Sequence, residues 1–264
     1  MLFTINDVTK YLETIAPLNL QESYDNSGLL AGEPNTPVTG ILLALDAVEE
    51  IVEEAIHHNC NLIITHHPII FRGLKTLTGK NYVERTVIKA IRNHIGLYAI
   101  HTNLDNVLHN GVNERIANQI NLQNQTILSP KTNNTEAGAG IIGTLQSPMN
   151  ENEFLGILKN TMKTSCIKHT KFLNRPIHSV AICGGAGSFL IPNAINAGAD
   201  AFITSDLKYH EFFDADNHLL LADIGHYESE QYTIDLLYDI IQQKMSTFAL
   251  RKTELLTNPV RYLF

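Results

Sequence analysis

Short apolar segments that alternate with helical segments constrain the fold of this chain more than any other feature. Residues 40–45 and 62–65 are almost entirely apolar, and residues 48–56 between them repeat apolar side chains at helical spacing. Apolar runs of this length indicate strands buried on both faces, which pair in parallel through a crossover helix. The pattern therefore predicts an α/β fold built around a parallel sheet.

Histidines and carboxylates follow three of the predicted strands, at the points where those strands end. The strand at 62–65 runs directly into His66 and His67, and a proline then takes the chain out of the sheet. The strands predicted at 96–100 and 219–222 are each followed by a histidine and, four residues later, a carboxylate. Ligands of open α/β sheets bind at the carboxyl edge of the strands, so we expect these groups to serve one site. The candidate metal ligands are His66, His67, Asp105, His226 and Glu230.

The chemical types of these residues indicate the metal and the reaction. Neutral imidazole with carboxylate suits Zn, Mn, Fe, Co or Ni, whereas thiolates would select Zn or an iron–sulfur centre. The candidate ligands exceed the roughly three that a catalytic zinc takes from a protein, which favours two divalent ions. Two-metal sites activate water and clamp substrate oxygens, so we expect hydrolysis of a phosphoryl, amide or ring C–N bond. His101 and Asp206 are the expected catalytic residues, either as partners that orient the ligands or as general acid and base.

Three further motifs have more than one interpretation at this level. The polar cluster at residues 24–28 either connects two elements or forms a loop of the site. The glycines within 184–187 either pack a tight turn or offer backbone N–H groups to a phosphate. His57 and His58 end a predicted helix, and we interpret them as a solvated helix end rather than as ligands.

The chain carries signs of an internal duplication. Residues 54–65 and 193–204 share a helix–turn–strand pattern at constant offset, with few identical positions. The composition turns polar over residues 122–135, which is typical of a boundary between domains. We therefore predict two similar α/β halves, residues 1–125 and 126–264, with the metal site between them.

Composition limits the partners of the protein. The formal net charge is −8 and no run is rich in Lys or Arg, so polymeric nucleic acid is not expected as a partner. Cys60, Cys166 and Cys183 contain no Cys-x-x-Cys pair and indicate reduced thiols. No apolar run approaches the roughly 18 residues of a membrane span, and the N-terminus lacks the layout of a signal peptide. We expect a cytoplasmic protein without a membrane segment.

Six short motifs, in order along the chain, resemble those of the Nif-three-like family, whose members are widely labelled GTP cyclohydrolase 1 type 2 homologues. The motifs are 24–29 (YDNSGL), 65–68 (THHP), 101–105 (HTNLD), 184–188 (GGAGS), 204–210 (TSDLKYH) and 225–230 (GHYESE). The chain departs from the family pattern at Ser205, where glycine is usual. The resemblance implies two similar α/β halves, toroidal homohexamers and dinuclear metal sites held by the same five ligands.

The resemblance also implies an activity, for which three alternatives remain. The first is a metal-dependent hydrolase that opens the ring of a nucleotide in the manner of a GTP cyclohydrolase. The second is a metal-holding scaffold or regulatory protein without turnover. The third is a nucleotide phosphatase or phosphodiesterase, which differs from the first in the bond that breaks.

Overall fold

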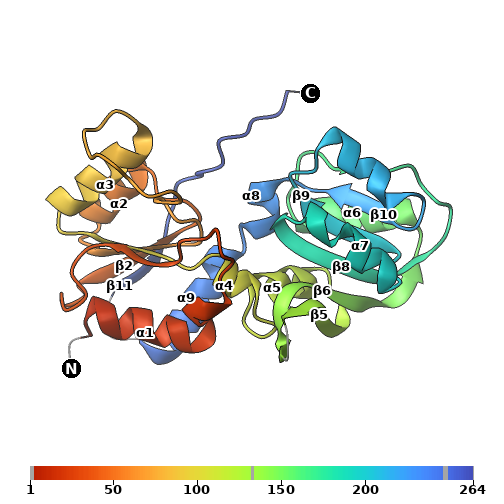
Figure 1. The fold of residues 1–264 in the computed structure, drawn as a ribbon, viewed down its shortest axis with the longest axis horizontal. Coiled ribbons are helices and arrows are strands. Elements are labelled where there is room, and N and C mark those ends of the chain that lie inside the picture. Colours follow the sequence, from red (N-terminus) through yellow and green to blue (C-terminus); the bar gives the residue numbers. More distant parts are fainter. Residues whose placement is uncertain (1–2, 132–133, 246–248, 264) are drawn as a thin grey trace. The chain divides into compact units, whose positions relative to one another are not determined.

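The structure is a computed structural model of the chain, and it describes residues 3–131, 134–245 and 249–263. Backbone contacts divide the chain into two compact α/β units (Figure 1), which confirms the prediction of two α/β halves. The first unit comprises Met1–Leu104 and Thr233–Pro259, and the second comprises Asp105–Tyr232 and Val260–Phe264. This division differs from the predicted ranges, since a C-terminal segment belongs to the first unit. Within the described residues, no helix is long and apolar enough to cross a lipid bilayer.

Among the described residues, the first unit forms a five-stranded sheet with the order β1-β4-β3-β2-β11. Strands β2, β3, β4 and β11 run parallel, and β1 is antiparallel to β4. The strands are β1 (Gly28–Ala31), β2 (Gly40–Ala44), β3 (Leu62–Thr65), β4 (Gly96–Ala99) and β11 (Ala249–Lys252). The helices are α1 (Ile5–Ile15), η1 (Leu18–Leu20), α2 (Glu49–His57), α3 (Tyr82–Arg92) and α9 (Thr233–Lys244), while α4 (Thr102–Asp105) ends where the second unit begins.

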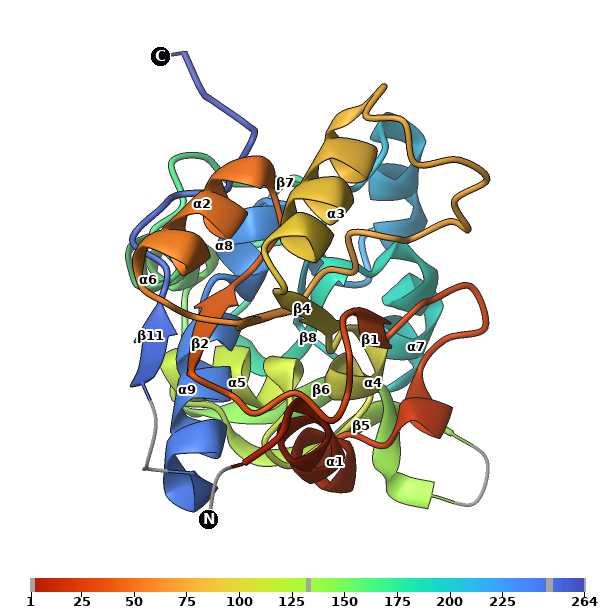
Figure 2. The same cartoon turned by 90° about the vertical axis from the view of Figure 1, so that its left-hand side faces the viewer.

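Helices cover both faces of the first sheet. Helices α2 and α3 lie on one face, and α1 and α9 lie on the other (Figures 1 and 2). Every residue of β2, β3 and β4 is buried in consequence. This cover explains why the sequence of these strands is apolar throughout instead of alternating with polar residues.

In the part of the chain that the structure describes, the second unit forms a six-stranded sheet with the order β5-β6-β8-β9-β10-β7. Strands β8, β9 and β10 run parallel, and the other pairs are antiparallel. The strands are β5 (Gln123–Lys131), β6 (Asn134–Met149), β7 (Lys168–His169), β8 (Ile177–Ala186), β9 (Ala201–Ser205) and β10 (Leu220–Asp223). The helices are α5 (Val112–Gln119), α6 (Glu151–Thr161), η2 (Ser188–Leu190), α7 (Ile191–Asn196), η3 (Tyr209–Ala215) and α8 (His226–Glu230).

The two units share the same central arrangement of strands. In the first, β2, β3 and β4 are adjacent, parallel and in chain order, and the second repeats this with β8, β9 and β10. The pairing of Thr65 with Ala99 has its counterpart in the pairing of Thr204 with Asp223. His101 follows Ala99 by two residues, whereas His226 follows Asp223 by three residues. The two histidines therefore differ by one residue in their distance from the end of the strand.

The polar segment at residues 122–135 does not form a linker. It contributes β5 and the start of β6, which pair as an antiparallel hairpin at the edge of the second sheet. Most side chains of β5 are exposed or half-buried. The polar composition therefore reflects an edge strand with a solvated face rather than a boundary between domains.

The sequence also predicts three elements that the structure places differently. We expect a strand at 167–173, a helix from Asp206 and a last strand at 247–250. The structure forms only the short strand Lys168–His169 in the first segment, and η3 starts at Tyr209. Asp206 itself has a left-handed backbone with φ of 57°. Residues 247 and 248 lie outside the described residues, and β11 begins at Ala249.

Glu84 gives the first unit a contribution to stability that depends on pH. Its buried carboxylate accepts hydrogen bonds from the backbone N–H groups of Thr78 (2.8 Å) and Lys80 (3.3 Å), which ties the loop before α3 to that helix. These bonds outweigh burial and lower the pKa of Glu84 from 4.5 to about 2. A carboxyl group with a lowered pKa stabilises the fold above its unfolded pKa, and the contribution is lost as pH falls from 4.5 towards 2.

We therefore expect the free energy of unfolding to fall between pH 6 and pH 3 by less in Glu84→Gln than in the unmodified protein. Urea titrations at several pH values measure the difference. Glu33→Gln, which changes an exposed glutamate of the same unit, serves as the control. Equal pH dependence in Glu84→Gln and in the unmodified protein would contradict the assignment.

Candidate metal centre

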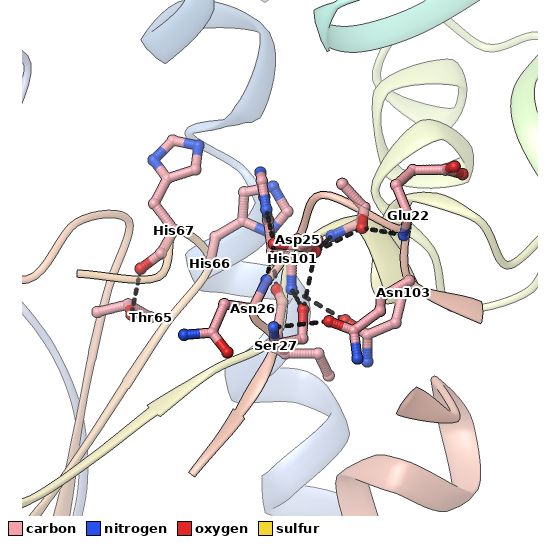
Figure 3. Close-up of polar contacts among 12 residues, drawn as sticks. Glu22, Asp25, Asn26, Ser27, Thr65, His66, His67, His101 and Asn103 are labelled. Atoms are coloured by element: carbon pink, nitrogen blue, oxygen red, sulfur yellow. Dashed lines mark hydrogen bonds and ion pairs between the residues drawn. The ribbon is translucent and has the colours of Figure 1, made fainter. Parts of the chain in front are cut away.

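Three histidines of the first unit meet at the carboxyl edge of its sheet. Strands β3 and β4 are adjacent and parallel, so His66 and His67 after β3 come beside His101 after β4 (Figure 3). One ring nitrogen from each imidazole can be chosen so that all three atoms lie within 4.8 Å of one another. Neighbouring nitrogen donors at this spacing are what a divalent transition metal requires.

Each of these imidazoles is oriented by an oxygen at Nδ1. His66 Nδ1 donates to the carbonyl oxygen of Ile100 at 2.9 Å. A carbonyl oxygen can only accept, so Nδ1 of His66 carries the proton and Nε2 carries the lone pair. His67 Nδ1 lies 2.7 Å from Asp46 Oδ1. Such contacts orient metal-ligating histidines and select Nε2 as the ligating atom.

The loop at residues 24–28 supports His101, which decides between the two interpretations of this polar cluster. Asp25 Oδ1 lies 2.8 Å from His101 Nδ1, and Asp25 Oδ2 accepts from the backbone N–H of Thr102 at 3.0 Å (Figure 3). Burial acts to raise the pKa of Asp25, but the hydrogen bonds and charge of His101 and the bonds from Thr102 hold that pKa well below its usual range. Asp25 is therefore a carboxylate that can stabilise and orient the imidazole.

Sequence reasoning did not identify Asp46 as part of this arrangement. Asp46 follows the end of β2, so it reaches the same sheet edge as His67. Its second oxygen accepts a hydrogen bond from the hydroxyl of Thr257 at 2.7 Å. A carboxylate directly after a buried parallel strand was the available signal, and it was the same signal that identified the ligands.

The second unit places His226 and Glu230 on one face of the short helix α8. His226 Nε2 and Glu230 Oε2 lie 3.1 Å apart, as expected for residues four apart in a helix. Nδ1 of His226 contacts Asp206 Oδ2 at 2.8 Å, which repeats the carboxylate–imidazole contact seen in the first unit. Burial acts to lower the pKa of His226, but Glu230 and Asp206 raise it to about 11. Asp206 therefore lies where it can orient His226.

Asp105 belongs to the second unit, and among the described residues it is not part of a group of three or more potential ligand atoms within 4.8 Å of one another. Its backbone carbonyl accepts from the side chain of Asn113 at 3.0 Å. The free thiol of Cys183 is buried, and burial together with the charges of Asp105 and Glu230 raises its pKa. A thiol in this setting stays protonated and does not compete with imidazole and carboxylate as a ligand.

The glycines after residue 183 make room for Glu230 rather than for a phosphate. Gly184 and Gly185 belong to β8, and their N–H groups donate to Asn113 Oδ1 (2.8 Å) and Ser229 Oγ (2.9 Å). Because both N–H groups already donate to side chains of the protein, the interpretation of Gly184 and Gly185 as a phosphate site is wrong. A Cβ at Gly185 would collide with Oε1 of Glu230 and lie 3.5 Å from Cε1 of His226. Tight packing, the other interpretation, is confirmed.

Comparisons with known proteins identify the family of the chain. The family described as Duf34/NIF3 (NGG1p interacting factor 3) matches residues 3–259. A Clostridium perfringens protein named GTP cyclohydrolase 1 type 2 homolog is 34% identical over 244 residues, which cover 92% of this chain and 93% of the relative.

Solved structures share the fold across the whole chain. A Bacillus cereus protein related to NIF3 aligns with a TM-score of 0.91 at 24% identity, and covers 100% of both chains. A Staphylococcus aureus hypothetical protein aligns with a TM-score of 0.90 at 29% identity, again over 100% of both chains. From the family match and the identity to the Clostridium perfringens protein, this chain belongs to the Duf34/NIF3 family.

Proposed function

We propose that this protein is a metal-dependent hydrolase that holds two divalent ions through His66, His67, Asp105, His226 and Glu230. The observation that carries the proposal is the state of the four histidines at the two candidate groups. Each has Nδ1 against an oxygen, from Ile100, Asp46, Asp25 or Asp206. Imidazoles held by an oxygen at Nδ1, so that Nε2 faces other potential ligand atoms, are typical of metal ligation.

Divalent ions in such a site supply Lewis acidity and lower the pKa of water towards neutrality. The protein's own groups prepare that chemistry. Asp46 and Asp206 orient His67 and His226, while Asp25 holds the ring of His101 in place. His101 can therefore donate or accept a proton as well as bind metal, and metal content in a His101→Gln variant separates the two roles.

Two exposed aromatic residues beside His101 favour a substrate with a planar ring. Phe71 is 44% exposed, and its ring centroid lies 6.3 Å from that of His101. Tyr24 is 61% exposed and lies 6.3 Å from Phe71. Exposed rings at the edge of a polar site offer stacking surfaces for a nucleobase. This arrangement supports a nucleotide as the substrate, and ring opening of its base is the reaction that we propose.

A turnover screen tests the reaction. Metal-loaded protein is incubated with GTP and other nucleotides, and the products are identified by mass. Formate release supports ring opening, whereas phosphate release replaces it with a phosphatase or phosphodiesterase. If no nucleotide yields a product while the metal remains bound, the enzyme proposal fails and the protein is a metal-holding scaffold.

The proposal includes the homohexamer that the family resemblance implies. Sedimentation velocity of the purified protein is expected to give a hexamer of 29.4 kDa chains. A monomer or dimer at micromolar concentration would reject this part of the proposal without affecting the metal assignment.

Asp46→Asn tests the orienting carboxylate in the first unit. An amide keeps the shape of the side chain but loses the charge that holds Nδ1–H of His67, so we expect metal affinity to fall by about 10- to 100-fold. Competition with a chromophoric chelator measures the affinity. Asp235→Asn, which removes an exposed carboxylate paired with Lys252 in the same unit, is the control. Equal affinities for both variants would count against the orienting role.

A further inference from the structure

A pocket of about 630 Å³ lies in the second unit, and none of its lining residues is a candidate metal ligand. One wall is the segment 168–173 at the edge strand β7, and the other is η3 with the turn that leads into β10. The floor is apolar, because Ala215 and Leu219 are buried there. The volume is in the range of small-molecule sites in proteins.

Aromatic rings stand on both walls of this pocket. Tyr209 and Phe213 of η3 are 74% and 66% exposed, with ring centroids 5.7 Å apart in an edge-to-face contact. On the other wall, the ring of His169 lines the pocket, and Phe172 behind it stacks on this ring with an interplanar angle of 10°. Large apolar rings left this exposed beside a pocket indicate a surface that a ligand covers. A planar ring can stack on such faces whatever its substituents.

Hydrogen-bonding groups line the same space. His169 Nδ1 donates to the carbonyl oxygen of Thr170 at 2.7 Å, which leaves Nε2 as an acceptor. The hydroxyl oxygen of Thr170 accepts from the backbone N–H of Leu221 at 3.1 Å, so its proton can be donated elsewhere. Donors and acceptors beside aromatic faces match a heteroaromatic ring better than a hydrocarbon.

One lysine of the lining can serve an anion. The charged residues of the lining are Lys168, Lys171 and Asp216. Lys168 pairs with the buried Asp223 at 2.6 Å, and two backbone N–H groups also donate to that carboxylate. Lys171 is exposed and forms no ion pair with another residue in the described ranges. Its ammonium group is therefore available to a ligand that carries negative charge.

We propose that this pocket binds a nucleotide, with the base against Tyr209 and Phe213 and a phosphate at Lys171. The proposal does not depend on the metal centre, since the pocket shares no residue with the candidate ligands. It adds a second small-molecule site to the protein, one whose occupant can differ from the substrate.

Calorimetric titration of the full chain with AMP, adenosine and inorganic phosphate tests the proposal. AMP is expected to bind more tightly than adenosine, and phosphate alone is expected to bind weakly. We expect Phe213→Ala to weaken AMP binding about tenfold and Lys171→Ala about fivefold, the latter without effect on adenosine. Phe189→Ala and Lys159→Ala, which alter exposed residues of the same unit outside the pocket, should leave the affinities unchanged.

Repeating the titration with EDTA separates this pocket from the metal centre. AMP binding that survives EDTA and responds to Lys171→Ala supports the proposal whether or not the metal assignment holds. AMP binding that disappears with EDTA and ignores both pocket variants places the nucleotide at the metal and overturns the proposal. Absence of AMP binding at millimolar concentration also overturns the proposal. So does a Phe213→Ala variant whose oligomeric state changes while its affinity for AMP does not.

Discussion

His66→Ala is expected to lower metal affinity by more than about a hundredfold, because it removes a ligand and not merely a group that orients one. His66 is fully buried and held by the carbonyl oxygen of Ile100, so its Nε2 has a fixed position in the site. Elemental analysis of the purified protein and competition with a chelator measure the loss. The matched control is His57→Ala, an exposed histidine in the last turn of α2.

A second variant distinguishes the loss of a metal ligand from a failure of the protein to fold. His67 is partly exposed, and its truncation leaves a smaller cavity than truncation of the buried His66. His67→Ala should therefore keep the circular dichroism spectrum of the parent while losing metal. Normal metal content in folded samples of both variants would exclude these histidines as ligands.

Gly185→Ala is expected to destabilise the protein by about 3 kcal/mol and to lower its metal content. The residue has φ of 64°, which an alanine adopts at a cost of about 1 kcal/mol, and its Cβ would collide with the buried carboxylate of Glu230. Glu230 must then move away from His226, with which it shares one face of α8. Loss of metal follows from this displacement, although residue 185 is not itself a ligand.

Gly198→Ala separates the collision from the backbone strain. Gly198 has nearly the same φ, 72°, but a Cβ there meets no atom within 4 Å. We expect this variant to lose about 1 kcal/mol and to keep its metal. Urea denaturation and elemental analysis of the two variants make the comparison. Equal behaviour of both would show that Glu230 does not depend on the space at Gly185.

Much of the first unit could be predicted from the pattern of apolar runs. Strands β2, β3 and β4 lie where the apolar segments are, because parallel strands covered on both faces must be apolar throughout. Prediction failed where exposure, not burial, governs composition. The sequence of the edge hairpin β5–β6 resembles a domain boundary, since an exposed edge strand and a linker are both polar.

The supporting groups of the candidate site could not be predicted in the same way. Asp25 is 76 residues from His101 in the chain, and Asp46 is 21 residues from His67. The spacing of apolar residues indicates whether a segment is buried, but it does not indicate which distant side chains that segment will contact. For this reason, the sequence alone allows both interpretations of the loop at 24–28.

By itself, the sequence determined the α/β class and the placement of imidazoles and carboxylates after strand ends, because both follow from local pattern and from the direction of a strand. Only the tertiary structure decided which nitrogen of each histidine faces an oxygen and why Gly185 must lack a side chain. It also decided that segments 168–173 and 209–219 enclose a pocket. Those features arise from contacts between residues far apart in the chain, and such contacts form only when the sheets are assembled.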